Sequence, residues 1–100
     1  MFLDTLACIH RGLGEYFKAE KEFMECLDIA EKLYIQNPEL NVTGLYNELK
    51  ELSFMYYDMK DKDNLNHYKA KALHCYNELN EVVKKEREES IKKIEQLVIE

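Results

Sequence analysis

The side chains best suited to chemistry are three cysteines and three histidines, and their spacing argues against a metal or catalytic site. Cys8 and His10 stand two apart, so on one helix they face different ways, and the adjacent His74 and Cys75 diverge. Neither pair has the spacing of a recognised zinc site. The sequence also contains no glycine-rich phosphate loop, nucleophile elbow or HExxH motif. We therefore expect no catalytic residues, no metal, no cofactor and no enzymatic activity.

Acidic pairs are the remaining candidates for acid–base chemistry, and we interpret them as solvated faces: Glu20/Glu22, Glu48/Glu51 and Glu88/Glu89. The net charge of −6 gives no electrostatic reason to bind nucleic acid or an anionic membrane surface. No apolar run approaches the roughly 20 residues that cross a bilayer. Three widely spaced cysteines predict no disulfide framework. We expect a cytoplasmic protein without a nucleic-acid or membrane partner.

The elements that position these residues are predicted to be helices. An apolar content of 46% with 34% charged residues, one proline and three glycines suits amphipathic helices more than a sheet. Apolar residues recur at three and four between breaks at 12–14, 37–38 and 58–64. The pattern predicts an all-α fold of tandem antiparallel helix pairs, with four helices plus a C-terminal helical extension. The second helix is expected over about 15–36, the third from Pro38 to about Tyr57, and the fourth after a cap at Asp61 or Asp63.

The extension, residues 80–100, has two open interpretations. No glycine or proline follows Leu79, and apolar residues keep a helical spacing to Val98. The fourth helix therefore either runs on to the end, or turns near Asn80 or in the charged stretch 84–90. In the second case the tail packs back as a capping helix.

An internal repeat appears when the chain is aligned with itself at a constant offset of 46 residues. Leu6-Ala7 overlays Leu52-Ser53, and the match continues through the following turn and helix: His10 on Tyr56, Gly14-Glu15 on Lys60-Asp61, Ala19 on Leu65, and Cys26-Leu27 on Ala72-Leu73. The repeat predicts two helical hairpins, 1–37 and 38–79, followed by the tail.

The first copy resembles a tetratricopeptide repeat, through Leu6-Ala7-x-x-His10-x-x-x-Gly14-Glu15-Tyr16-x-x-Ala19-x-x-x-Phe23-x-x-Cys26-Leu27. The long period is similar to the variants found in kinesin light chains and bacterial arrays. The second copy departs from the pattern, and the resemblance covers about residues 2–79. It implies a half-buried His10 and a core position for Cys26. It also leaves Tyr34, Tyr46 and Tyr57 outside the packing positions.

The resemblance implies a right-handed solenoid whose first helices line a concave face. Seven residues are expected on that face, as a partner-binding surface: Asp4, Cys8, Arg11, Asn47, Lys50, Phe54 and Tyr57. Packing of Phe54 or Tyr57 against the tail is an equal alternative. The implied function is a non-enzymatic scaffold that binds a protein or peptide, as a fragment of a longer array or a self-associating homodimer. The alternative function is a peptide-sensing regulatory domain of a larger bacterial regulator.

Overall fold

The computed structural model describes residues 2–100, with side chains described from Thr5 onward. These residues form six helices and no strand, which confirms the all-α prediction. The helices are α1 (Phe2–Gly12), α2 (Tyr16–Gln36), α3 (Pro38–Met59), α4 (Lys62–Asn77), α5 (Glu81–Glu86) and α6 (Glu88–Glu95). Within the same residues, none of the helices combines the length and apolar character that a membrane crossing needs.

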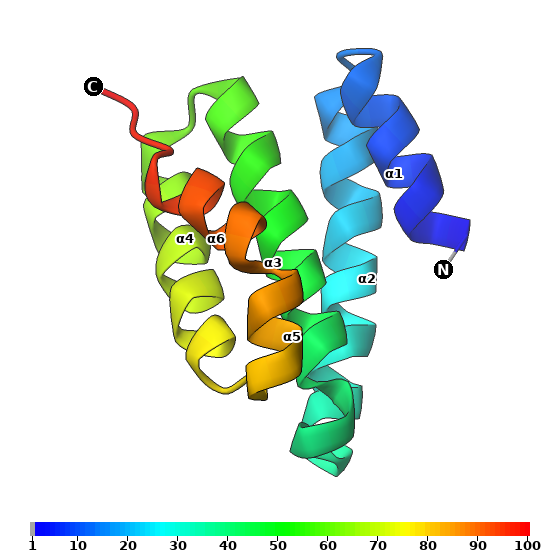
Figure 1. The fold of residues 1–100 in the computed structure, drawn as a ribbon. Coiled ribbons are helices and arrows are strands. Elements are labelled where there is room, and N and C mark those ends of the chain that lie inside the picture. Colours follow the sequence, from blue (N-terminus) through cyan, green and yellow to red (C-terminus); the bar gives the residue numbers. More distant parts are fainter. Residues whose placement is uncertain (1) are drawn as a thin grey trace.

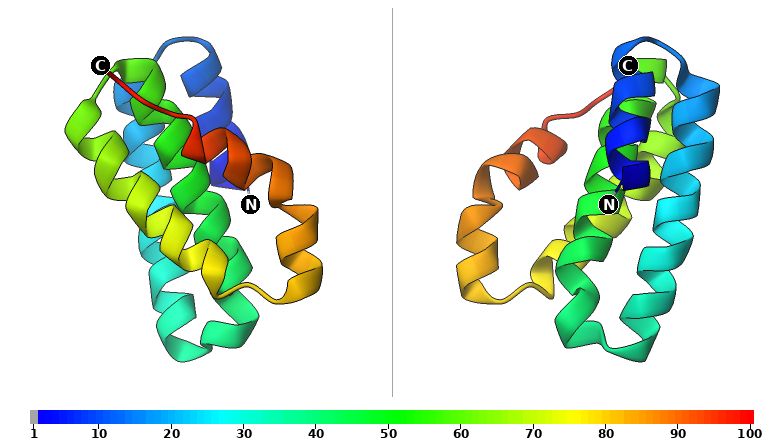
Figure 2. Two further views of the ribbon diagram at one scale, coloured as in Figure 1. Left: turned by 60° about the vertical axis from the view of Figure 1, so that its left-hand side comes forward. Right: turned by 90° about the vertical axis from the view of Figure 1, so that its right-hand side faces the viewer.

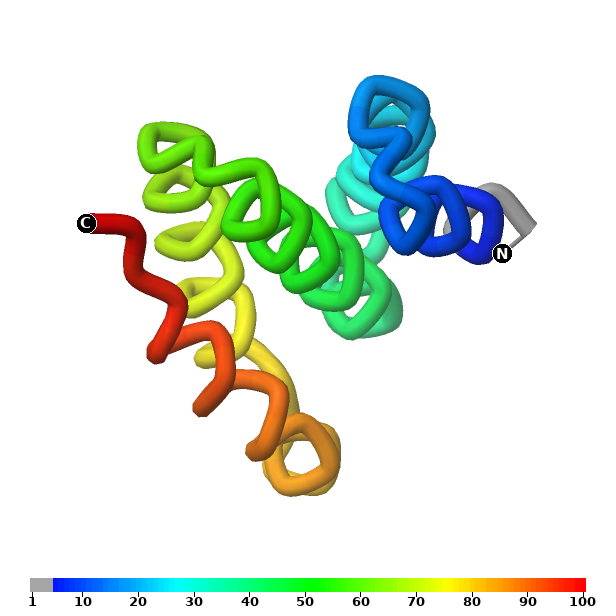
Figure 3. Tube along the Cα trace, turned by 90° about the horizontal axis from the view of Figure 1, so that it is seen from above, coloured from blue at the N-terminus to red at the C-terminus, as the bar shows by residue number. Residues whose placement is uncertain are grey.

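The first four helices run alternately up and down (Figure 1), and each packs mainly on its neighbours along the chain. Seen from above, α3 lies between the α1–α2 pair and α4 (Figure 3). The helix boundaries follow local sequence signals. Asn37 ends α2 and caps α3, accepting a hydrogen bond from the backbone N–H of Leu40 at 3.3 Å, and Pro38 opens α3. Of the two candidate caps for α4, Asp61 is the one used, accepting from the N–H of Asn64 at 3.2 Å.

The turns α1–α2 and α3–α4 have the same backbone geometry, 46 residues apart. Gly14 has φ 79° and Lys60 has φ 58°, so both residues are left-handed. The next residue closes each turn with an equivalent hydrogen bond, from Glu15 N–H to His10 C=O at 2.8 Å and from Asp61 N–H to Tyr56 C=O at 3.0 Å. The structure therefore repeats the turn at the offset that the sequence alignment has.

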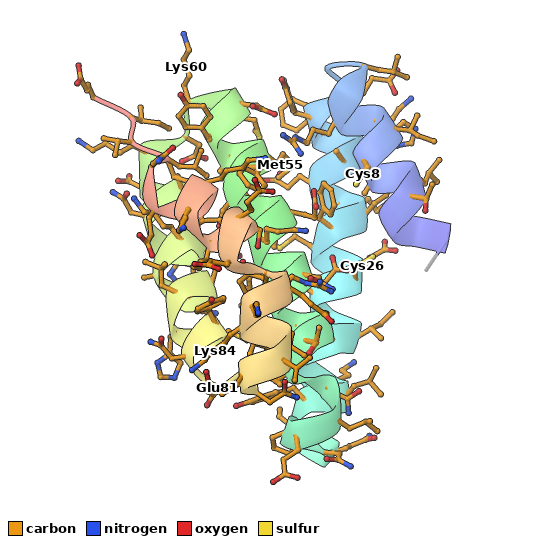
Figure 4. All side chains as sticks on the ribbon, viewed as in Figure 1. Cys8, Cys26, Met55, Lys60, Glu81 and Lys84 are labelled. Carbon is orange, nitrogen blue, oxygen red and sulfur yellow. The ribbon has the colours of Figure 1, made fainter. Side chains whose placement is uncertain are left out.

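Exchanging the residues of the two turns is expected to change stability in opposite directions. Lys60 projects into solvent (Figure 4), and its left-handed backbone costs about 1 kcal/mol that glycine avoids. We expect Lys60→Gly to raise the melting temperature by about 4–8 °C. We expect Gly14→Lys to lower it, although a Cβ at Gly14 has open space around it. Calorimetry of both variants is the measurement, and a lower melting temperature for Lys60→Gly contradicts the expectation.

One hydrophobic core runs through α1–α4 and reaches α6. Equivalent positions of the two helix pairs are buried alike: Ala19 with Leu65, and Cys26 with Ala72, are all 0% exposed. The small side chains Ala19, Cys26 and Ala72 let helix axes approach closely, while Phe23 and Leu65 fill the space between the helices. The core position expected for Cys26 is confirmed.

The tail folds back, so the alternative of an unbroken fourth helix is wrong. Helix α4 ends at Asn77, and Asn80 caps α5 by accepting from the N–H of Val83 at 2.9 Å. A second break at Arg87 separates α5 from α6. The tail then lies along the side of α4 away from α2 (Figure 3) and crosses in front of α3 and α4 (Figure 2). Both predicted turning points are thus used.

Two isoleucines and a set of hydrogen bonds attach the tail to the helix pairs. Ile91 and Ile94 are buried, and α6 packs on both α3 and α4. Tyr46 is fully buried, and its hydroxyl lies 2.7 Å from Ser90 Oγ. The expectation that Tyr46 falls outside the packing positions is therefore wrong: its ring centroid lies 5.8 Å from that of Tyr76 in α4, and its hydroxyl contacts the tail, which the repeat pattern does not include. The Tyr76 hydroxyl adds a bond to Lys84 C=O at 2.9 Å.

Candidate functional site

A polar groove between α1, α3 and the tail contains three of the predicted partner-binding residues. We call it the polar groove; it has a volume of about 480 Å³ and is lined by Thr5, Cys8, Asn47, Glu48, Lys50, Glu51 and Arg87. Cys8 comes from α1, visible in Figure 4, and Asn47 and Lys50 come from α3. Asn47 and Lys50 stand three apart, so they share one helix face. The structure thus brings Cys8, Asn47 and Lys50 together across about 40 residues of chain.

Arg11 lies in a smaller cavity that adjoins the polar groove at Cys8 and also contains Asp58. Its Nε donates to Asp58 Oδ2 at 2.8 Å, and its Nη1 is 3.5 Å from Glu51 Oε2. The guanidinium also lies 5.9 Å from the ring centroid of Phe54. Arg11 therefore ties α1 to α3 and is engaged within the chain.

Phe54 and Tyr57 line neither of these two cavities. Phe54 is half-buried against the hydrophobic core, and Tyr57 is 42% exposed. The side chain of Asp4, the seventh predicted residue, lies outside the described residues.

The charges of the polar groove are balanced. Lys50 Nζ is 3.4 Å from Glu51 Oε1, and Arg87 Nε donates to Asn47 Oδ1 at 3.4 Å. Two cations and two carboxylates line the groove, counting the buried Glu48. Such a surface can pair with a segment that carries both signs of charge and can exchange hydrogen bonds with its backbone.

Sequence reasoning misses four of the groove residues, Thr5, Glu48, Glu51 and Arg87, and Arg87 is the most distant of them along the chain from the predicted helix faces. It belongs to the tail, beyond the stretch that the repeat pattern covers, and only the turn after Asn77 brings it to α3. Nothing in the charged sequence around Arg87 indicates that its side chain lies beside Asn47 of α3.

Two of the three acidic pairs are not solvated faces, contrary to the sequence interpretation. Glu20 accepts a hydrogen bond from the buried Tyr56 hydroxyl at 2.7 Å, and Glu22 lies 2.6 Å from His10 Nδ1. Glu48 is buried and Glu51 half-buried in the polar groove. Glu20, Glu22 and Glu51 each pair with a residue of another helix, which a helical wheel of one helix cannot reveal. Glu88 and Glu89 are exposed as expected, and the half-buried state expected of His10 is confirmed.

Burial raises the pKa of groups that stay neutral in the core. Burial, and then the hydrogen bond to Glu20, raise the pKa of Tyr56 well above 10.0. Burial, with the nearby Glu78 carboxylate, raises the pKa of the Cys75 thiol from 9.0 to about 12. Among residues with described side chains, no three His, Cys, Asp or Glu residues are placed to hold a metal ion.

These shifts predict a loss of stability at alkaline pH. A raised pKa means that the fold favours the neutral Cys75 thiol over the thiolate. The stability that this preference contributes is complete below pH 9.0 and is lost as the pH rises through about 12. We expect the urea midpoint of the wild type to fall as the pH rises from 9.0 to about 12, and to fall less in Cys75→Ala over the same range. A midpoint that stays constant in strongly alkaline buffer contradicts this expectation.

A second groove, lined by α2, α3 and α4 and about 540 Å³ in volume, includes no residue of the tail. We call it the apolar groove, and its lining is Glu31, Tyr34, Ile35, Leu45, Leu49, Ala70, Lys71, His74, Cys75 and Glu78. Across this groove, the Tyr34 hydroxyl donates a hydrogen bond to Glu78 Oε2 at 2.7 Å.

No family model, curated protein or solved structure matches the chain. The geometry of the two grooves and the internal repeat are therefore the basis for inferring function.

Proposed function

We propose that the chain is a non-enzymatic protein- or peptide-binding module of the tetratricopeptide type, and that the polar groove holds the partner. The observation that carries the proposal is the convergence of Cys8, Asn47 and Lys50, predicted as concave-face residues, on one groove. The groove volume of about 480 Å³ lies within the usual range of binding clefts, roughly 300–1,000 Å³.

The repeated turn supports the tetratricopeptide part of this proposal. Left-handed residues at Gly14 and Lys60, with equivalent closing bonds, are consistent with α1–α2 and α3–α4 as two copies of one unit. Equivalent burial of Ala19 with Leu65 adds the packing expected of stacked repeats. In such a stack, α1 and α3 are the first helices of their units, and the polar groove lies between them.

Charge explains the kind of segment that the polar groove suits. Lys50 and Arg87 supply positive charge beside Glu48 and Glu51, within reach of an extended backbone. A partner that carries an acidic and a basic residue can form ion pairs with Lys50 and Glu51. These pairs then take the place of the ion pair between Lys50 and Glu51 within the chain. Because these pairs are partly exposed, exchanging them costs little.

Selection from a displayed library of random dodecapeptides tests the proposal. Peptides enriched on the wild type are synthesised with a fluorescent label, and their anisotropy is measured with Lys50→Glu and with Lys85→Glu. Lys85 is exposed on α5 and lies outside the polar groove, so it controls for the charge change. We expect Lys50→Glu to weaken binding about tenfold or more and Lys85→Glu to leave it unchanged.

Two results overturn the proposal. If no peptide is enriched, the binding function is wrong. If the enriched peptides bind both variants as tightly as the wild type, the polar groove is not the binding site.

A further inference from the structure

The apolar groove lies beside the end of the α2–α3 hairpin, where several large apolar side chains are exposed. Four large apolar residues in the stretch 29–40 are strongly exposed: Ile29 at 43%, Leu33 at 45%, Ile35 at 78% and Leu40 at 75%. They belong to the last turns of α2 and the first turn of α3. This hairpin end projects beyond α4 and α5 (Figure 1). Around α2, Ile35 lies roughly a third to a half of a turn from Ile29 and Leu33, so it is the exposed apolar residue of this stretch that lines the apolar groove.

Ile35 connects the projecting end with the groove. It lines the apolar groove and is nevertheless 78% exposed, so its side chain stands at the rim. The floor beside it consists of apolar atoms of Leu45 and Leu49. An isoleucine at the rim of one groove has the size and character to cover the floor of another.

The charged residues of the apolar groove indicate what covers it. Glu31 comes from α2 and Lys71 from α4, so an anion on one wall stands opposite a cation on the other. The remaining carboxylate, Glu78 at the end of α4, accepts the hydrogen bond from Tyr34 within the same copy. A twofold axis that runs along the groove places α2 of each copy over α4 of the other. Glu31 of one copy then faces Lys71 of the other, twice in the dimer. The groove is thus self-complementary in charge as well as in apolar character.

We propose that the apolar groove is a homodimer surface and that its occupant is the apolar groove of a second copy of this chain. Ile35 from each copy covers Leu45 and Leu49 of the other, and Glu31 pairs with Lys71 across the twofold axis. This surface contains none of the residues that line the polar groove, so either proposal can fail without the other.

Sedimentation velocity over a dilution series of the purified chain tests the dimer, with five variants, one of which is a control. Ile35→Asp places a charge at the centre of the contact, and Glu31→Lys and Lys71→Glu each put like charges opposite one another. The double reversal Glu31→Lys/Lys71→Glu restores both pairs. Leu13→Asp, at a side chain 70% exposed in the α1–α2 turn, is the matched control for Ile35→Asp.

We expect a concentration-dependent dimer for the wild type and for Leu13→Asp, and a monomer for Ile35→Asp. Each single charge reversal is expected to raise the dimer dissociation constant about tenfold or more, and the double reversal to recover most of that loss. Circular dichroism checks that every variant keeps its helices, as exposed positions should. A wild type that is monomeric at all concentrations overturns the proposal. So does a dimer that Ile35→Asp leaves intact, or a double reversal that recovers nothing.

Discussion

Replacing Tyr56 with alanine is expected to lower the free energy of unfolding by about 3–5 kcal/mol, the range for deleting a buried aromatic ring. Tyr56 is 1% exposed and joins three helices. From α3, its ring stacks on that of Tyr68 in α4, with centroids 5.5 Å apart and 10° between the planes. Its hydroxyl donates to Glu20 of α2 at 2.7 Å. Alanine leaves a cavity at this junction and removes the partner of a half-buried carboxylate.

Urea unfolding followed by circular dichroism measures this loss, and two variants separate its causes. Tyr56→Phe keeps the stacked ring and removes only the hydrogen bond, so we expect a loss of about 1 kcal/mol. Tyr57→Ala, at the neighbouring exposed side chain, is expected to change stability by about 0.5 kcal/mol or less. Equal losses for Tyr56→Ala and Tyr57→Ala contradict the central position that the structure gives to Tyr56.

Replacing Ile94 with alanine is expected to cost about 2–5 kcal/mol and to release the tail before the rest of the fold. Ile94 is 0% exposed, and with Ile91 it supplies the buried apolar side chains of α6. Hydrogen exchange of individual amides is the suitable measurement. Amides of α6 are expected to exchange about 30-fold faster or more, whereas those of α2 keep more of their protection.

Val98→Ala is the control for this variant, because Val98 lies in the same tail and is 62% exposed. It should leave the exchange of α6 unchanged within about twofold, since little apolar area is lost. If Ile94→Ala leaves the α6 amides as protected as in the wild type, the docking of the tail depends on other contacts.

The helices of the two pairs could be predicted from the sequence because their signals are local. Apolar spacing of three and four, Pro38 after Asn37, and Gly14 in a turn each depend on a few adjacent residues. The turn at Lys60 has no glycine, yet it adopts the same geometry. The polar stretch 58–64 predicts a break there, but only the offset of 46 points to Lys60 as the left-handed residue, since lysine by itself does not predict a left-handed backbone.

The position of the tail and the roles of the buried polar groups could not be predicted in the same way. Lys84 and Arg87 lie in a charged stretch that is compatible with a straight helix and with two short ones. The choice depends on two free energies. Packing Ile91 and Ile94 on α3 and α4 must stabilise the chain by more than the two helix breaks destabilise it. That balance depends on tertiary contacts, and so do the burial of Glu48 and the placement of Arg87 beside Asn47.

The order in which the helices pack along the chain has a consequence for the speed of folding. Each of α1–α4 contacts chiefly the helix that precedes or follows it, so most native contacts close short loops. Chains with such local contacts cross their folding barrier in about microseconds to milliseconds. The attachment of α6 to α3 and α4 can form only after those two helices meet. We therefore expect the ring of Tyr46 to be the last large side chain to lose its water, when Ser90 arrives beside its hydroxyl.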